Sequence, residues 1–171
     1  MDSIHAAIDW VCKTTGARQV VLCGLRLGAT LAAVAATQRD DLAGLILLSP
    51  NLRGRSFIRQ LEIEAKLAGT ARDDGSLEAH GLVLSAEAVR EIASVDLANT
   101  RLPTGCRVMA FNAAESPVLD RCILAWRQGG GAATTDDFAG LTQFLRPSFM
   151  SHEPPAQVSR ITQWLQETVP P

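Results

Sequence analysis

Hydrophobic positions along the chain alternate between two patterns, helical spacing and short apolar runs. Residues 3–15 carry apolar side chains at helical spacing. Short, mainly apolar runs follow at 19–23 and 42–48, separated by an alanine- and leucine-rich stretch at 27–37. Short apolar runs bounded by turn residues are typical of strands buried on both faces. The pattern therefore predicts a βαβ unit with parallel strands and a right-handed crossover.

The segment 53–97 interrupts this alternation. Its pattern predicts a helix over 57–67, a polar turn region, a short extended piece at 82–84, and a second helix over 86–93 that Ser85 can cap. We therefore expect a mostly helical cap insertion that lies over one end of the sheet.

The alternation resumes after the insertion. It predicts a third strand at 107–111, a helix over 117–128 with a proline in its first turn, and a shorter fourth strand at 132–135. A terminal amphipathic helix is expected over 156–168. The fold class is thus α/β, with a mainly parallel sheet of three to four strands flanked by helices in a single domain, 1–171.

Composition narrows the class of protein. The chain has 171 residues, 47% of them hydrophobic and 20% charged, which suits one globular domain. A net charge of -2 argues against a dedicated nucleic-acid binder or a basic membrane-surface protein. No apolar run approaches the roughly 20 residues that span a bilayer, and the first residues do not resemble a signal peptide. We expect a cytoplasmic protein.

The pattern of metal-ligating residue types predicts no metal site and no cofactor. His5 and His80 have no partners at metal-ligand spacing, and Asp136-Asp137 reads as a loop or helix-cap pair. No CxxC pair is present, which argues against a zinc ribbon or a thioredoxin motif. We expect small buried residues with reduced thiols at all four cysteines: Cys12, Cys23, Cys106 and Cys122.

One short string between the first strand and its helix carries the candidate chemistry, Gly24-Leu25-Arg26-Leu27-Gly28. The central residue of such a string sits on a very tight turn, so small residues are needed two positions to either side. Gly24 and Gly28 meet that need, although the pair also fits an ordinary strand-to-helix turn. The following helix points its free N–H groups toward the same place. We expect ligand binding at Gly24, Leu25, Arg26 and Leu27.

Two later residues extend the motif. Glu115 follows the third strand, in the loop at its carboxyl end, and His152 lies in a loop before the last helix. Asp120 is a competing acid, but it falls inside the helix that begins at Pro117. The chain order of turn, acid and histidine is the order of the α/β-hydrolase triad.

With these residues the sequence resembles the α/β-hydrolase superfamily, in particular serine-aminopeptidase-like and lysophospholipase-like hydrolases. The string at 24–29 is similar to the nucleophile elbow of the second type of hydrolase associated with bacterial exosortase and exopolysaccharide gene clusters. The strings at 57–61, 80–85 and 96–97 are similar to the cap region of that group. The resemblance covers nearly the whole chain.

The resemblance implies ester or acyl hydrolysis by a nucleophile, a histidine base and a carboxylate, with His152 and Glu115 in the last two roles. Arg26 occupies the nucleophile position, and a guanidinium stays protonated with no lone pair to offer. We therefore expect impaired or atypical catalysis. Cys23 and Ser49 are the nearby alternative nucleophiles.

Several readings of the site stay open at this point. Arg26 can pair with Glu115 in place of the triad network, or it can bind an anionic ligand at the helix N-terminus. His152 can equally be a surface-loop histidine without a role. At the level of function, the alternatives to a hydrolase are a non-catalytic binding protein for a small anionic or acyl ligand, and an interaction or scaffold protein.

The fold that the chain resembles carries further strands before the elbow strand. The present sequence opens on the helix that precedes that strand, so we expect it to be the C-terminal portion of a longer hydrolase. If the sheet is instead incomplete, its exposed edge favours a homodimer.

Overall fold

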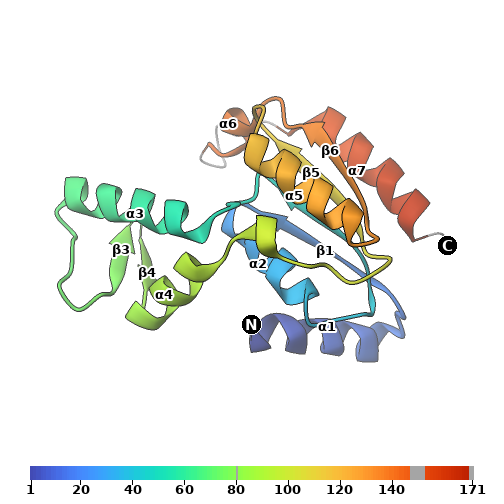
Figure 1. Ribbon diagram of the computed structural model, residues 1–171, viewed down its shortest axis with the longest axis horizontal. Coiled ribbons are helices and arrows are strands. Elements are labelled where there is room, and N and C mark those ends of the chain that lie inside the picture. The colour runs from blue at the N-terminus through green and yellow to red at the C-terminus, as the bar shows by residue number, and fades with distance from the viewer. Residues whose placement is uncertain (80, 147–152, 170–171) are drawn as a thin grey trace. The chain divides into compact units, whose positions relative to one another are not determined.

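The computed structural model describes residues 1–79, 81–146 and 153–169 (Figure 1). The chain divides into two compact units. The larger combines Met1–Pro50 with the chain from Ala98 onward, and the smaller is Asn51–Leu97. No helix in the described ranges is long and apolar enough to cross a membrane.

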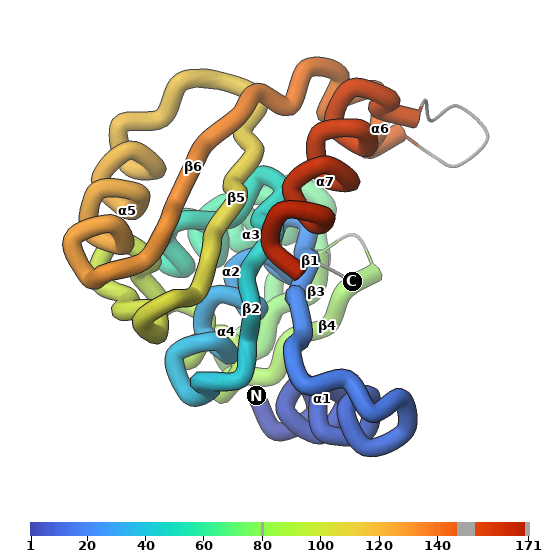
Figure 2. Tube along the Cα trace, turned by 90° about the vertical axis from the view of Figure 1, so that its right-hand side faces the viewer, coloured from blue at the N-terminus to red at the C-terminus, as the bar shows by residue number. Residues whose placement is uncertain are grey.

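A four-stranded sheet forms the centre of the larger unit, and every neighbouring pair of strands in it is parallel. The strand order is β1-β2-β5-β6, with β1 and β6 at the two edges of the sheet (Figure 2). The strands are β1 (Val20–Leu25), β2 (Leu42–Leu48), β5 (Arg107–Asn112) and β6 (Ala132–Asp137). The predicted α/β fold with a parallel sheet is confirmed, and the fourth strand is two residues longer than its pattern indicated.

Helices lie on both faces of this sheet. Figure 2 shows α7 (Pro155–Thr168) in front of the strands and α2 (Leu27–Ala36) behind them. α2 buries five alanines and a threonine, and these small side chains let its axis approach β1 and β2 closely. α5 (Pro117–Gln128) packs against β6, while the short α6 (Leu141–Phe144) follows that strand.

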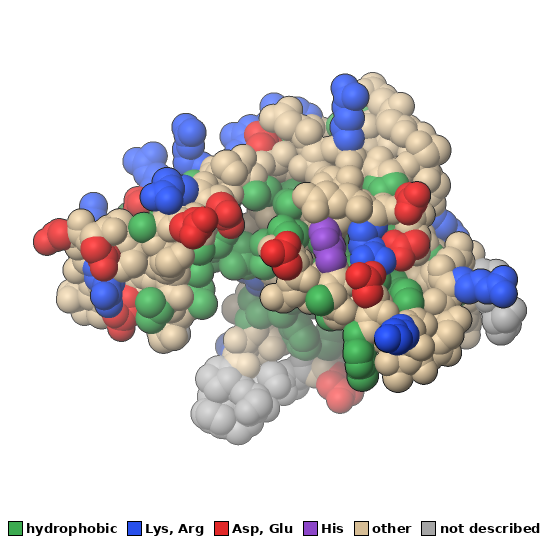
Figure 3. Space-filling view, turned by 90° about the horizontal axis from the view of Figure 1, so that it is seen from below, with side chains coloured by type: hydrophobic (Ala, Val, Ile, Leu, Met, Phe, Trp, Pro, Cys, Tyr) green, Lys and Arg blue, Asp and Glu red, His purple; other side chains and the backbone are tan. Residues whose placement is uncertain are grey.

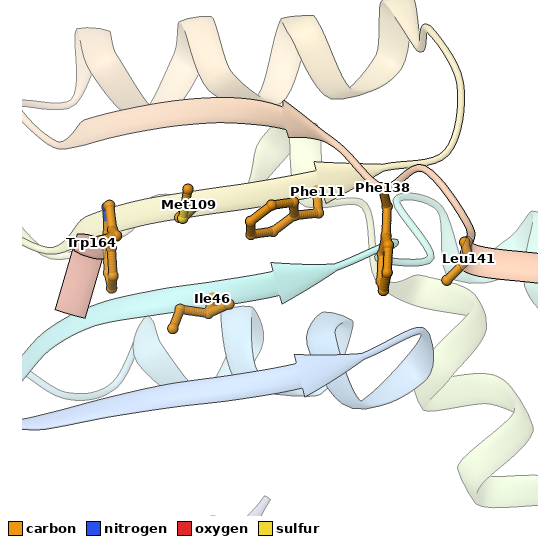
Figure 4. Packing of buried hydrophobic residues seen from close by; sticks show 6 residues of the cluster. All are labelled: Ile46, Met109, Phe111, Phe138, Leu141 and Trp164. Atoms are coloured by element: carbon orange, nitrogen blue, oxygen red, sulfur yellow. The ribbon is translucent and has the colours of Figure 1, made fainter. Parts of the chain in front are cut away.

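The core beneath α7 is aromatic. Trp164 of α7 lies over Ile46 and Met109, and Phe111 meets Phe138 edge to face with ring centroids 6.2 Å apart (Figure 4). Gly44 makes room for the indole, because a Cβ atom at that position would lie 2.6 Å from Cη2 of Trp164. Packing of this face therefore depends on the absence of a Cβ atom at Gly44 in β2.

The smaller unit has its own core. α3 (Gly54–Ala68) packs on the hairpin of β3 (Leu77–Ala79) and β4 (Leu82–Leu84), with α4 (Ala86–Ser94) beside it and one 3-10 turn at Leu97–Asn99 following. The sequence pattern predicted the two helices and β4 but missed β3, a strand of only three residues. That this unit serves as a cap stays a prediction.

The four cysteines do not share one environment. Cys106 and Cys122 are buried as expected, and burial raises the pKa of the Cys106 thiol to about 11. The expectation was wrong for Cys23, which is exposed, and for Cys12, which is only half-buried. Cys23 pairs in register with the buried Ile46, but it belongs to an edge strand, β1, whereas Ile46 belongs to the inner strand β2 on which α7 packs.

An ion-pair network ties α1 (Asp2–Thr15) to the turn between α2 and β2. Arg39 donates from Nε and Nη2 to both carboxylate oxygens of Asp41, at 2.8 and 2.5 Å, and from Nη1 to Asp9 at 2.7 Å. The paired guanidinium holds the pKa of Asp41 below its ordinary range. Figure 3 shows acidic and basic groups side by side on this lower face.

Replacing Asp41 should make stability depend less on pH. Because the folded-state pKa of Asp41 is lowered, its pair with Arg39 stabilises the fold above the ordinary aspartate pKa and is lost as pH falls through the folded value. We expect Asp41→Asn to lower the free energy of unfolding by about 0.5–1 kcal/mol at pH 7 and by nothing measurable near pH 2. Urea titrations at both pH values check this, with Asp40→Asn as the exposed neighbouring control. An equal loss at both pH values would contradict the ion-pair account.

Candidate functional site

The carboxyl ends of all four parallel strands meet at one edge of the sheet. Their register places Leu25, Leu48, Phe111 and Asp136 next to one another. The following residues form a second row, which we call the strand-end row: Arg26, Ser49, Asn112 and Asp137.

Backbone hydrogen bonds continue past the strands and hold this row in place. The N–H of Arg26 donates to the carbonyl of Leu48 at 2.9 Å, and the N–H of Ser49 donates to that of Phe111 at 2.7 Å. The N–H of Phe138 donates to Asn112 at 2.8 Å. The candidate site thus rests on a row of hydrogen-bonded backbone at the carboxyl ends of the strands.

Arg26 adopts a backbone conformation that disfavours any side chain, with φ 54° and ψ -119°. Such strain costs about 1–3 kcal/mol and persists only where the surroundings enforce it. Here hydrogen bonds to both the N–H and the carbonyl of Arg26 enforce the conformation. The carbonyl of Arg26 accepts from the N–H groups of Ala29 at 3.1 Å and Thr30 at 3.3 Å, and also from the buried Thr30 hydroxyl at 3.3 Å. The turn is therefore a strained elbow between β1 and α2.

Gly24 is needed for this elbow because α2 crosses it closely. A Cβ atom at Gly24 would lie 2.4 Å from the carbonyl oxygen of Gly28 and 2.5 Å from the nitrogen of Ala29. The expected need for a small residue at Gly28 is not borne out in the described structure, where a Cβ atom at that position would meet nothing within 4 Å.

The elbow presents positive charge. α2 begins at Leu27, so its first N–H groups have no partner within the helix, and its first turn carries no acidic residue. The Arg26 side chain is half-buried and forms no ion pair with any residue in the described ranges. The reading in which Arg26 pairs with Glu115 is therefore wrong for this structure.

Glu115 lies further along the same sheet edge, beyond β5. It is exposed and lines a cleft of about 540 Å³ together with Asn112, Ser116 and Asp137. Asp120 also lines this cleft, so its place inside α5 does not remove it from the site. Carboxylates dominate the cleft, yet no group of three potential ligands among the described residues could hold a metal ion.

One expected site residue remains to be placed. His152 lies outside the described residues, so its role as a base stays a prediction. The sequence pattern identified Ser49 only as an alternative nucleophile and did not identify Asn112 as a site residue. The interpretation of Asp136-Asp137 as a loop or helix-cap pair was wrong, because both residues lie at the end of β6. The signal for Asn112 and Asp137 was present, because polar residues that directly follow buried parallel strands gather at one sheet edge.

No protein-family model and no curated protein matches the chain. Solved structures do match it. Est1E from Butyrivibrio proteoclasticus with bound ferulic acid superposes with a TM-score of 0.67 at 17% identity, over 98% of this chain and 66% of that one. A Pyrococcus furiosus esterase gives 0.57 at 11% identity, over 97% and 60% of the two chains. The monoacylglycerol lipase of Paleococcus ferrophilus gives 0.56 at 14%, over 98% and 75%.

These matches define the fold. The chain has a partial α/β-hydrolase fold, distantly similar to that of esterases and lipases, and it spans 66% of the Est1E chain. The turn between β1 and α2 is a strained strand-to-helix turn, and the nucleophile elbow of that fold is also a strained strand-to-helix turn. At these identities the likeness concerns the fold, and activity has to be argued from the site.

The two elbow glycines should respond oppositely to the same change. Gly24→Ala forces a Cβ atom into backbone, so we expect a loss of about 3 kcal/mol or more in the free energy of unfolding. Gly28→Ala meets open space inside a helix and should be neutral or stabilising by up to about 1 kcal/mol. Urea denaturation of both variants measures this. Equal destabilisation by the two variants would contradict the described elbow.

Proposed function

We propose that this chain is a protein of α/β-hydrolase fold whose elbow binds an acyl carboxylate instead of attacking an ester. The observation that carries the proposal is Arg26, a half-buried cation at the elbow that pairs with no acid in the described ranges. A guanidinium has no lone pair for nucleophilic attack, so Arg26 cannot attack an ester as the nucleophile of such an elbow does.

The electrostatics of the elbow favour a carboxylate. A guanidinium presents paired donors that match both oxygens of a carboxylate, and such charge-assisted hydrogen bonds are among the strongest in proteins. The N–H groups at the start of α2 add further donors and positive potential. An acyl carboxylate is also the acid that ester hydrolysis releases, which connects this ligand with the esterases and lipases of similar fold.

Residual ester hydrolysis is the second candidate, and the elbow conformation at Arg26, φ 54°, favours it. In that case Glu115 supplies the carboxylate and His152 the base, and another hydroxyl or thiol acts as nucleophile. The narrower relation to exosortase-associated hydrolases is likewise a proposal. It is supported by the sequence strings at 24–29 and 57–61, with 53–97 as the cap over the ligand.

Carboxylate binding should depend on the Arg26 charge. We expect octanoate to bind the wild-type chain in isothermal titration calorimetry and Arg26→Ala to bind it about 10- to 100-fold more weakly, the equivalent of about 1.5–3 kcal/mol for charge-assisted hydrogen bonds. Arg18→Ala is the matched control, since Arg18 is an exposed arginine just before the amino end of β1. Wild-type affinity in Arg26→Ala, or no binding at all, would refute the proposal.

Hydrolysis should be absent. With p-nitrophenyl butyrate we expect the wild-type chain to give a rate no higher than the buffer, because the elbow lacks a nucleophile. If turnover is seen and either Glu115→Ala or His152→Ala abolishes it, the binding proposal gives way to the catalytic one. Turnover that both variants leave unchanged would remove these two residues from any triad.

A further inference from the structure

Ser49 is the second strained residue of the strand-end row. Within the described residues, only Arg26 and Ser49 combine a side chain with a positive φ, at 54° and 47°. They end adjacent strands, and the Arg26 N–H donates to the carbonyl of Leu48, directly before Ser49. The chain therefore concentrates this kind of strain at two neighbouring positions of one sheet edge.

Glycine at position 49 would allow the same fold with less backbone strain than serine. Glycine adopts a positive φ without steric cost, whereas serine pays for its Cβ atom. Pro50 restricts the conformation of the residue before it still further. Strained backbone conformations of this kind cluster at active sites and ligand-binding sites.

The Ser49 side chain has no protein partner in the described part of the chain. The residue is only 4% exposed, and its one hydrogen bond to a described residue runs from its backbone N–H to Phe111. Strain and an unmatched donor thus coincide next to Arg26.

We infer that Ser49 is a second binding residue of the elbow, whose hydroxyl donates a hydrogen bond to the carboxylate held by Arg26. The inference rests on the proposed function and extends it, because the ligand then contacts Arg26 at the end of β1 and Ser49 at the end of β2. The strained backbone keeps the hydroxyl at the sheet edge, and the ligand supplies the acceptor that the described protein lacks.

Two substitutions separate a binding role from a structural one. We expect Ser49→Gly to raise the urea midpoint of unfolding, because it relieves the strain, while weakening octanoate binding about tenfold. Ser49→Ala keeps the strain and loses the hydroxyl, so it should weaken binding to the same extent without the gain in stability. Ser3→Ala, an exposed serine of α1, should leave both measurements unchanged.

The outcomes distinguish this inference from the proposed function. If octanoate binding requires Arg26 but both Ser49 variants bind like the wild-type chain, the inference about Ser49 is overturned and the proposed function stands. If the wild-type chain does not bind octanoate, both are overturned. If Ser49→Gly lowers the urea midpoint, the argument from backbone strain is wrong.

Discussion

The parallel register of β1, β2 and β5 is the constraint on which the candidate site depends. Parallel strands send their carboxyl ends to one edge, and each neighbour fixes the next through slanted hydrogen bonds. Those bonds continue one residue past the strands and draw Arg26 and Ser49 into the same row. A slip of one residue between β1 and β2 would reverse the face of every side chain on the slipped strand and take the elbow out of this row.

Close packing of α2 turns that edge into an elbow. Gly24 lets the helix cross the strand end, and the small side chains of α2 keep it near the sheet. The consequence is a positive φ at Arg26, so that an arginine residue lies directly before the N-terminus of α2. In hydrolases of this fold the geometry exposes a nucleophile. With arginine in that position the same geometry offers a cation, and for this reason binding is the function that we propose.

Sequence patterns predicted the sheet well and the site only in part. Short apolar runs identify β1 and β2, although β1 lies at an edge of the sheet, while β3 was missed because three residues are too few to show a periodicity. The exposure of Cys23 depends on which helix covers an edge strand, which no local pattern encodes. The strain at Ser49 arises from bonds between strands distant in sequence, so only the structure could reveal it.

The most direct test of this account is a high-resolution crystal structure of the chain soaked with octanoate. We predict positive φ angles at Arg26 and Ser49, with the carboxylate within hydrogen-bonding distance of the Arg26 guanidinium and the Ser49 hydroxyl. Ordinary negative φ angles at both residues, or a carboxylate bound away from the strand-end row, would contradict it.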